Sequence, residues 1–107
     1  MSIGAAVFVE PALSTDLVVT EIHSDTEAHV TRALELGRDG MTLRRSPART
    51  RVGRFVWLEF ALGGVGMRVL AEVVGRSPES TRINFKHFWP QDRARYVQFL
   101  SLTRAAA

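Results

Sequence analysis

The stretch F-V-W-L-E-F-A-L-G-G-V-G-M-R-V-L-A-E-V-V, from Phe55 to Val74, decides the fold. Apolar residues occupy every second position on both sides of a glycine-rich break at residues 63–66. A period of two is that of a β-strand with one buried face, and clustered glycines indicate a turn. The stretch therefore predicts a β-hairpin with one face toward a core. The residues of that face are Val56, Leu58, Phe60, Leu62, Met67, Val69, Ala71 and Val73.

The segment after the hairpin predicts one more strand and a helix. R-I-N-F-K follows a turn at residues 75–81 and places Ile83 and Phe85 on its inner face. Pro90 suits the first turn of a helix, and Asp92 stands beside the positive end of the helix dipole. Three- and four-residue spacing defines the inner face of this helix. Its members are Trp89, Arg93, Tyr96, Val97 and Leu100.

The segment before the hairpin is partly ambiguous. Asp16–Ile22 is rich in β-branched residues and predicts a strand. Residues 24–36 fit two structures. A capping-box pattern, S-D-T-E, followed by Gly37 fits a helix. Local alternation, with Leu34 and Leu36 inward and Ala33 and Glu35 outward, fits a strand, and periodicity alone leaves both open.

Length and composition indicate one domain. The chain has 107 residues and no cysteine, which excludes disulfides and thiolate metal sites. We expect a core at about residues 15–102, a short arm at residues 1–12, no membrane span, no signal peptide and a cytoplasmic location. Short strands followed by one helix predict a mainly β fold, a small six-stranded antiparallel barrel. The helix is expected to plug one end of the barrel and to bury Trp89 and Tyr96.

The order of these segments resembles the PilZ domain, a bacterial barrel that commonly binds cyclic di-GMP. L-E-L-G-R-D-G-M-T-L is similar to the family's D/N-x-S-x-x-G strand-turn-strand. R-V-G-R-F-V-W-L-E-F-A-L is similar to its glycine-plus-hairpin segment, and R-I-N-F-K-H-F-W-P-Q-D-R-A-R-Y-V-Q-F-L to its last strand and closing helix. The resemblance spans about residues 30–102 and favours a strand at residues 30–36. It implies a regulatory domain without enzymatic activity.

The motif positions depart from the family pattern. Glu35 stands where Asp or Asn is expected, Gly37 stands where Ser is expected, and Gly40 alone matches. Residues 1–31 contain no arginine, so the family's N-terminal R-x-x-x-R is absent. Each lost charged hydrogen bond costs about 1.5–3 kcal/mol. We therefore expect weak or no binding of cyclic di-GMP and no cofactor.

Charge is distributed unevenly along the chain. Residues 1–31 hold five acids and no Lys or Arg, whereas residues 32–54 hold seven arginines. The leading interpretation is an adaptor in cyclic di-GMP, motility or surface-behaviour signalling that works through protein–protein contact. The expected contact residues are Arg44, Arg45, Arg49, Arg51, Phe55 and Trp57. The plainer interpretation is a solvated basic loop that pairs with the acidic first third of the chain.

Two further functions stay open. Arg45-Ser-Pro-Ala-Arg49 spells R-x-x-x-R after the motif instead of before it, so an atypical cyclic di-GMP receptor is the second interpretation. A small basic barrel that stacks nucleic-acid bases on Phe55 and Trp57 is the third and least favoured. We expect the C-terminal helix to cover part of that aromatic face and a protein partner, or a second copy in a homodimer, to cover the rest.

Other chemistry finds little support in the sequence. His23, His29 and His87 lack metal-ligand spacing and are expected to be surface or half-buried residues. The serines lie in turns without a G-x-S-x-G elbow. The glycines at 63, 64 and 66 lack the following helix that a phosphate-binding loop requires. We therefore expect no catalytic residues, no metal site and no enzyme.

Overall fold

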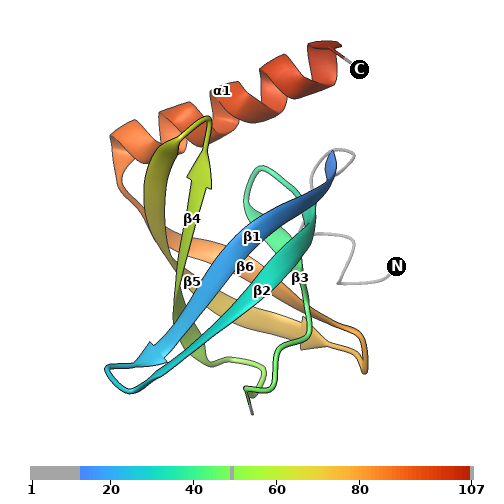
Figure 1. Ribbon diagram of the computed structural model, residues 1–107, viewed down its shortest axis with the longest axis vertical. Coiled ribbons are helices and arrows are strands. Elements are labelled where there is room, and N and C mark those ends of the chain that lie inside the picture. The colour runs from blue at the N-terminus through green and yellow to red at the C-terminus, as the bar shows by residue number, and fades with distance from the viewer. Residues whose placement is uncertain (1–12, 49, 107) are drawn as a thin grey trace.

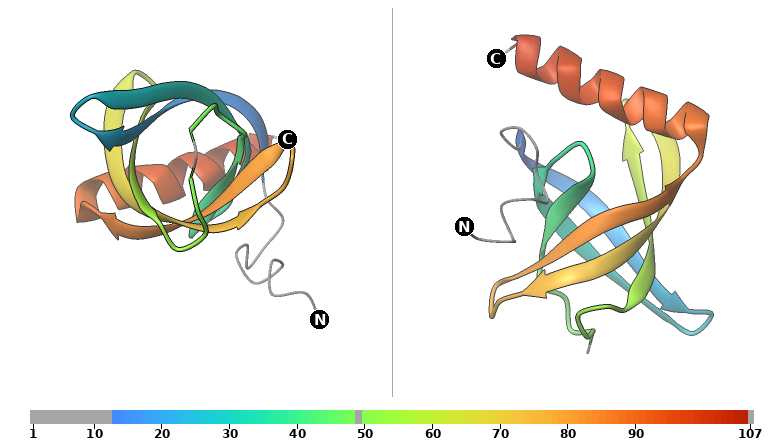
Figure 2. Two further views of the ribbon diagram at one scale, coloured as in Figure 1. Left: turned by 90° about the horizontal axis from the view of Figure 1, so that it is seen from below. Right: turned by 180° about the vertical axis from the view of Figure 1, so that it is seen from behind.

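The computed structural model describes residues 13–48 and 50–106. Six strands precede one helix in the order β1 (Leu13–Ser24), β2 (Glu27–Leu36), β3 (Gly40–Arg44), β4 (Phe55–Leu62), β5 (Val65–Arg76), β6 (Ser80–Phe88) and α1 (Pro90–Ala106). All neighbouring strands are antiparallel, and they close into a barrel in the order β1-β2-β3-β6-β5-β4. Figure 1 shows α1 across one end of this barrel, and Figure 2 shows the closed ring of strands. The predicted fold class is confirmed.

The β4–β5 hairpin has the register that the alternation predicts. Val56 lies opposite Ala71, Leu58 opposite Val69, and every residue of the predicted inner face is buried. The turn is narrower than the glycine cluster suggests, because β5 already begins at Val65. Gly63 and Gly64 form it with φ of 56° and 82°, a backbone region that favours glycine. This two-residue turn sets the register of the β4–β5 hairpin.

Residues 27–36 form a strand and not a helix. The inward residues of β2 differ from the prediction, which was wrong for Ala33. Ala33 is fully buried, Leu34 is half-buried, and Leu36 is fully buried. The pairing of β2 with β3 shifts between Ala33 and Glu35, which is a β-bulge. The extra residue lets Ala33 and Leu36 both face the core, a spacing that strict alternation does not allow.

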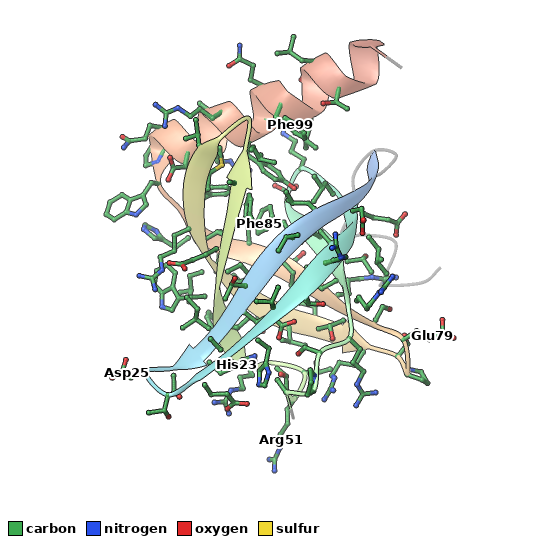
Figure 3. The ribbon with its side chains drawn as sticks, in the orientation of Figure 1. His23, Asp25, Arg51, Glu79, Phe85 and Phe99 are labelled. Atoms are coloured by element: carbon green, nitrogen blue, oxygen red, sulfur yellow. The ribbon has the colours of Figure 1, made fainter. Side chains whose placement is uncertain are left out.

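The inner side of α1 seals the barrel. Tyr96 and Leu100 are buried among the core residues, and Phe99 packs against them in part. The Tyr96 ring lies 5.2 Å from Phe85 and 6.1 Å from Phe60, centroid to centroid. Figure 3 shows Phe85 inside the barrel and Phe99 on the side of α1 that faces it. The core therefore continues from the strands into the helix.

The prediction that α1 buries Trp89 is wrong. Trp89 precedes the first residue of the helix and is 55% exposed. Its ring packs edge-to-face with the His87 ring on the outside of β6, with 5.3 Å between the ring centroids. The helical spacing was extended one residue too far toward the N-terminus, because Pro90 begins the helix and leaves Trp89 in the connection. In the described part of the chain, no helix is long and apolar enough to cross a membrane.

Candidate functional site

The predicted motif positions lie at the β2–β3 connection beside α1. Glu35 is exposed on β2, whereas Gly37 and Gly40 are buried. Gly37 N–H donates to the Gly40 carbonyl at 2.8 Å and closes a tight turn. The carboxylate of Glu35 has no hydrogen-bond or ion-pair partner among the residues that the structure describes. It is thus the one motif side chain open to an incoming molecule.

Gly40 is required by the packing of β3 on β6. Gly40 pairs with Asn84, and a Cβ atom on Gly40 would lie 2.1 Å from the Ile83 carbonyl oxygen. No real Cβ contact is that short, so β6 would have to move away from β3. The single match to the family motif therefore has a steric cause within the barrel.

Side chains from α1 bind the β2–β3 turn. The Tyr96 hydroxyl donates to the Gly37 carbonyl at 2.7 Å, and Arg93 Nη2 lies 2.9 Å from Asp39 Oδ1. Gly37 offers no hydroxyl, and its backbone serves as an acceptor for the helix. Sequence reasoning missed Asp39, although its position inside the turn of the motif could have drawn attention to it. This end of the barrel is thus joined to the helix by one buried and one exposed interaction.

The arginines lie at the opposite end, in and around the β3–β4 loop at residues 45–54. Arg44, Arg45, Arg51 and Arg54 are exposed, and none forms an ion pair with a described carboxylate. Figure 3 shows Arg51 pointing away from the barrel at the end remote from α1. Arg45 instead donates to the Ser77 carbonyl at 3.2 Å. These four side chains form no ion pair with a described acid of the first third, although Arg54 contributes, after the His29 hydrogen bond, to lowering the pKa of Glu27.

The structure separates the motif from the arginine pair that was considered as its substitute. Gly40 begins β3 and Arg44 ends it, so the strand places about 13 Å between them at about 3.3 Å per residue. Arg49 lies outside the described residues, and its part in the predicted Arg45/Arg49 pair is not placed. Arg45 therefore belongs to the arginine-rich end and not to the Glu35–Gly40 turn.

Phe55 and Trp57 lie on the outer face of β4. Phe55 is 50% exposed, and Trp57 is half-buried beneath Arg68, whose guanidinium carbon lies 5.2 Å from the ring centroid. The expectation that α1 covers this face is wrong, because α1 packs on the barrel end through Tyr96 and Leu100. The cover over Trp57 comes from its own sheet, as a cation–π contact.

The aromatic surface extends beyond the two predicted residues. Trp57 pairs with Leu70 on β5, and Leu70 pairs with His87 on β6. His87 in turn contacts Trp89. We call this set of outward side chains the aromatic face. It consists of Phe55, Trp57, Leu70, His87 and Trp89.

Most charges around the aromatic face are paired. Arg68 Nε lies 3.2 Å from Glu59 Oε2, and Lys86 Nζ lies 3.1 Å from Glu72 Oε1. Paired charges lower the net potential and leave apolar surface as the main feature of this face. Trp89, Arg68 and Glu59 also line a shallow hollow of about 400 Å³.

Polar side chains close the end of the barrel away from α1. Glu21 is buried, and its Oε1 lies 3.0 Å from His23 Nε2 and accepts from the Ser46 hydroxyl at 2.9 Å. His23 is more buried than the sequence led us to expect, with 3% of its side chain exposed. These contacts tie the β3–β4 loop to β1.

His23 also lines a surface hollow of about 370 Å³ at this end, together with His29 and Glu27. The hydrogen bond from His29 at 3.0 Å holds the pKa of Glu27 below its ordinary value of 4.5. Across the residues described by the structure, no three His, Asp or Glu side chains are placed to hold a metal ion. The hollow is therefore lined by the His29–Glu27 pair and by His23, and these described side chains form no metal-binding arrangement.

Comparison with known proteins finds similarity in structure and none in sequence. No protein-family model and no curated protein matches the sequence. Among solved structures, the PilZ domain of CeSA from a cellulose-synthesising bacterium superposes with a TM-score of 0.72 at 13% identity, over 88% of this chain and 99% of that one. The fold is that of a PilZ domain.

Two further structures share this fold. The inhibitor of motility from Bacillus subtilis superposes with a TM-score of 0.78 at 12% identity, over 89% of this chain and 50% of that one. An uncharacterised Legionella protein superposes with a TM-score of 0.60 at 13% identity, over 91% of this chain and 95% of that one. The agreement is in backbone arrangement, since identity is this low in all three.

The three sequence segments that suggested the resemblance fall on consecutive parts of the PilZ fold. The first covers the end of β2 and most of β3, the second covers β4, and the third covers most of β6 and of α1, while β5 lies between the second and the third. Within this fold, Gly40 packs against the Ile83 carbonyl, Glu35 presents an exposed carboxylate, and Gly37 offers only its backbone.

Proposed function

We propose that this PilZ-like domain is an adaptor that acts through protein–protein contact in cyclic di-GMP, motility or surface-behaviour signalling in the bacterial cytoplasm. The structural neighbours include a PilZ domain of a cellulose-synthesising bacterium and an inhibitor of motility, which supports this area of biology. The proposal has no catalytic step and no metal. The observation that carries it is the exposed aromatic face.

The chemistry of the motif turn argues against tight dinucleotide binding. Cyclic di-GMP carries two phosphates and two guanines, which call for charge-assisted donors. Near the turn, Arg93 is paired with Asp39, and the Gly37 carbonyl accepts from Tyr96. Glu35 adds a negative charge at the same place, which would repel a phosphate. Arg38 is an exposed arginine of this turn without an ion pair among the described residues, and the charge of Glu35 opposes it, so the turn lacks the pair of arginines that two phosphates would require.

The aromatic face has the composition of a protein contact. Large exposed aromatic side chains are enriched where proteins bind one another, and arginines are enriched with them. The chain leads directly from Arg51 and Arg54 in the β3–β4 loop into Phe55. We infer a partner with an apolar patch that meets Phe55 and Trp89 and with acidic residues beside it that meet Arg44, Arg45 and Arg51.

Site-specific photo-crosslinking tests this contact in cells. A photoreactive phenylalanine at Phe55 is expected to give a discrete adduct with one protein. The matched control places it at Leu102, which is 63% exposed on the outside of α1. Adduct formation at position 55 is expected to fall when Arg44 and Arg51 are changed to Glu. The absence of an adduct, or the same adduct from both positions, would contradict the proposal.

Titration with cyclic di-GMP separates the adaptor from the atypical receptor. Since a ligand at a hundredfold over its Kd stabilises by about 2.7 kcal/mol, a receptor would show a clear rise in Tm. We expect no such rise at micromolar ligand. A rise that is lost in Arg45→Ala would establish the receptor and remove the adaptor from first place.

A nucleic-acid function predicts a different signature. Binding through phosphates weakens steeply as salt is raised, and base stacking on Trp57 would be lost in Trp57→Ala. We expect no salt-dependent binding of single-stranded oligonucleotides that also requires Trp57, because Arg68 already occupies the ring face.

A further inference from the structure

The β5–β6 turn contains a small pocket that the proposed adaptor function does not use. Gly75, Arg76, Ser77, Ser80 and Arg82 line it, and its volume is about 180 Å³. It lies at the far end of β6 from the helix, and Figure 3 shows Glu79 at the tip of the same turn. Pockets that enclose whole small molecules have about 300–1,000 Å³, so this one suits a single small group.

Backbone geometry keeps the pocket open above Arg82. Gly75 pairs with Arg82, next to a shift of register between Val73 and Gly75. A Cβ atom on Gly75 would lie 3.6 Å from the Arg82 Cβ, so a longer side chain there would project across the Arg82 stem. Because Gly75 has no side chain, the guanidinium of Arg82 is not covered by its cross-strand neighbour.

Arg82 is a half-buried cation without a partner. Among the described residues, its guanidinium makes no hydrogen bond and no ion pair, and its Nε is shielded from solvent. Arg76 has the same shielded and unpartnered Nε, while its Nη1 donates to the Thr50 carbonyl. Buried polar atoms are normally hydrogen-bonded and half-buried charges normally paired, and here the Nε atoms of both guanidinium groups have no acceptor among the described residues.

Residues around the pocket add positive charge, and none of them forms an ion pair with Arg76 or Arg82 among the described residues. Arg44 pairs with Ser80 across β3 and β6, and Arg45 reaches the Ser77 carbonyl. Glu79 is the acid of this turn, and it forms no ion pair within the described residues. The hydroxyls of Ser77 and Ser80 hydrogen-bond to each other at 2.9 Å at the pocket, which leaves one of the two O–H groups to donate to a ligand. Guanidinium groups with hydroxyl groups are a donor set that suits an oxyanion.

We infer that this pocket is a binding site for one phosphoryl group, held by Arg76 and Arg82 with the Ser77 and Ser80 hydroxyls beside them. The group is inorganic phosphate or the terminal phosphate of a small phosphate ester whose remainder projects into solvent. The site is about one strand length from the motif turn, so it is separate from the family's ligand position. It also does not depend on the aromatic face or on a protein partner.

Nuclear magnetic resonance titration of the purified protein tests the site. Inorganic phosphate and glycerol 3-phosphate are added at constant ionic strength against sodium chloride. Saturable shifts are expected for the amides of residues 75–82 with both phosphates and not with chloride. A tighter Kd for the ester assigns the natural ligand to the ester class, and equal values assign it to free phosphate. Shifts that spread over the whole surface, or that chloride reproduces, would overturn the inference.

Paired variants separate a built site from general positive charge. Arg76→Gln and Arg82→Gln are each expected to weaken phosphate binding at least tenfold. Arg38→Gln, which removes one exposed charge at the β2–β3 turn, is expected to leave the Kd within twofold. Arg82→Lys keeps the charge without the planar fork and is expected to give an intermediate Kd. If either Gln variant loses its native spectrum, Gly75→Leu tests the pocket by filling it. Equal losses in the Arg38 and Arg82 variants would overturn the site.

Discussion

Gly40 occupies a position where any side chain collides with the backbone of β6. We expect Gly40→Ala to lower the free energy of unfolding by about 1–3 kcal/mol, the usual cost of forcing atoms into a packed region. Gly66→Ala is the matched control, because nothing lies within 4 Å of its Cβ position and its φ is not positive. It should be neutral or stabilise the fold by about 0.4–1 kcal/mol. Urea denaturation measures both, and equal effects would contradict the steric argument.

The Tyr96 hydroxyl joins the helix to the motif turn inside the core. Tyr96→Phe leaves the Gly37 carbonyl without this donor, so we expect a loss of about 1–3 kcal/mol in the free energy of unfolding. Arg93→Ala removes the exposed ion pair with Asp39 in the same place, and exposed pairs contribute about 0.2–1 kcal/mol. Thermal and urea denaturation compare the two variants. A costlier Arg93→Ala would show that the turn is held mainly by charge.

The pKa of Glu27 is lowered by its hydrogen bond from His29. A carboxyl with a lowered folded pKa stabilises the fold above the ordinary value of 4.5, and this contribution is lost as the pH falls through the lower folded value. In His29→Gln we expect the Glu27 pKa to rise toward 4.5, as followed by NMR titration of its side chain. His87→Gln should leave it unchanged, since His87 contacts Trp89 and not Glu27. A Glu27 pKa that stays low in His29→Gln would assign the shift to another group.

Only one side of the helix α1 packs against the barrel. Leu100 is 2% exposed and packs in the barrel end, whereas Leu102 on the same helix is 63% exposed. We expect Leu100→Ala to lower the free energy of unfolding by about 2–5 kcal/mol and Leu102→Ala to change it by less than about 0.5 kcal/mol. Chemical denaturation of the pair reports which side seals the barrel. Similar costs for both would mean that α1 is oriented differently.

Elements with regular periodicity could be predicted from the sequence, and irregular ones could not. The β4–β5 hairpin alternates without interruption, so its inner face was predicted residue by residue. The bulge in β2 places both Ala33 and Leu36 inside the barrel. No local sequence pattern predicts this bulge, because it depends on the pairing of β2 with β3. Trp89 shows the same limit, because helical spacing does not say at which residue a helix begins.

At the scale of the whole molecule, the barrel closes through a short seam. Three aligned residue pairs join β1 to β4 within the described residues, compared with eight between β4 and β5. Short pairing opens at lower free energy than long pairing. In native-state hydrogen exchange, we expect the amides that join β1 to β4 to exchange faster than those that join β4 to β5. Equal protection at both would show that the barrel opens as one cooperative unit.

The positions of the candidate site residues also depend on how distant strands pair in the barrel. Sequence reasoning selected the arginines of the 44–54 stretch together with Phe55 and Trp57, and the structure places those it describes at one end of the barrel and on β4. It did not find Trp89, Leu70 and His87, because the pairing of β4 with β5 and of β5 with β6 brings them beside Trp57. Nor did it find Arg76 and Arg82, whose buried Nε atoms are brought to one pocket only once β5 and β6 pair.

The sequence by itself determined the class of fold, the alternating inner face of the β4–β5 hairpin, a helix with Pro90 in its first turn, and the absence of arginine before the motif. These follow from backbone preference, alternation and residue identity, which are local properties. Only the tertiary structure decided that α1 binds the motif turn, that the arginines lie about one strand length away from it, and which side chains stay uncovered. The physical reason is that burial and pairing depend on strands far apart in the chain, and closure of the barrel sets them together.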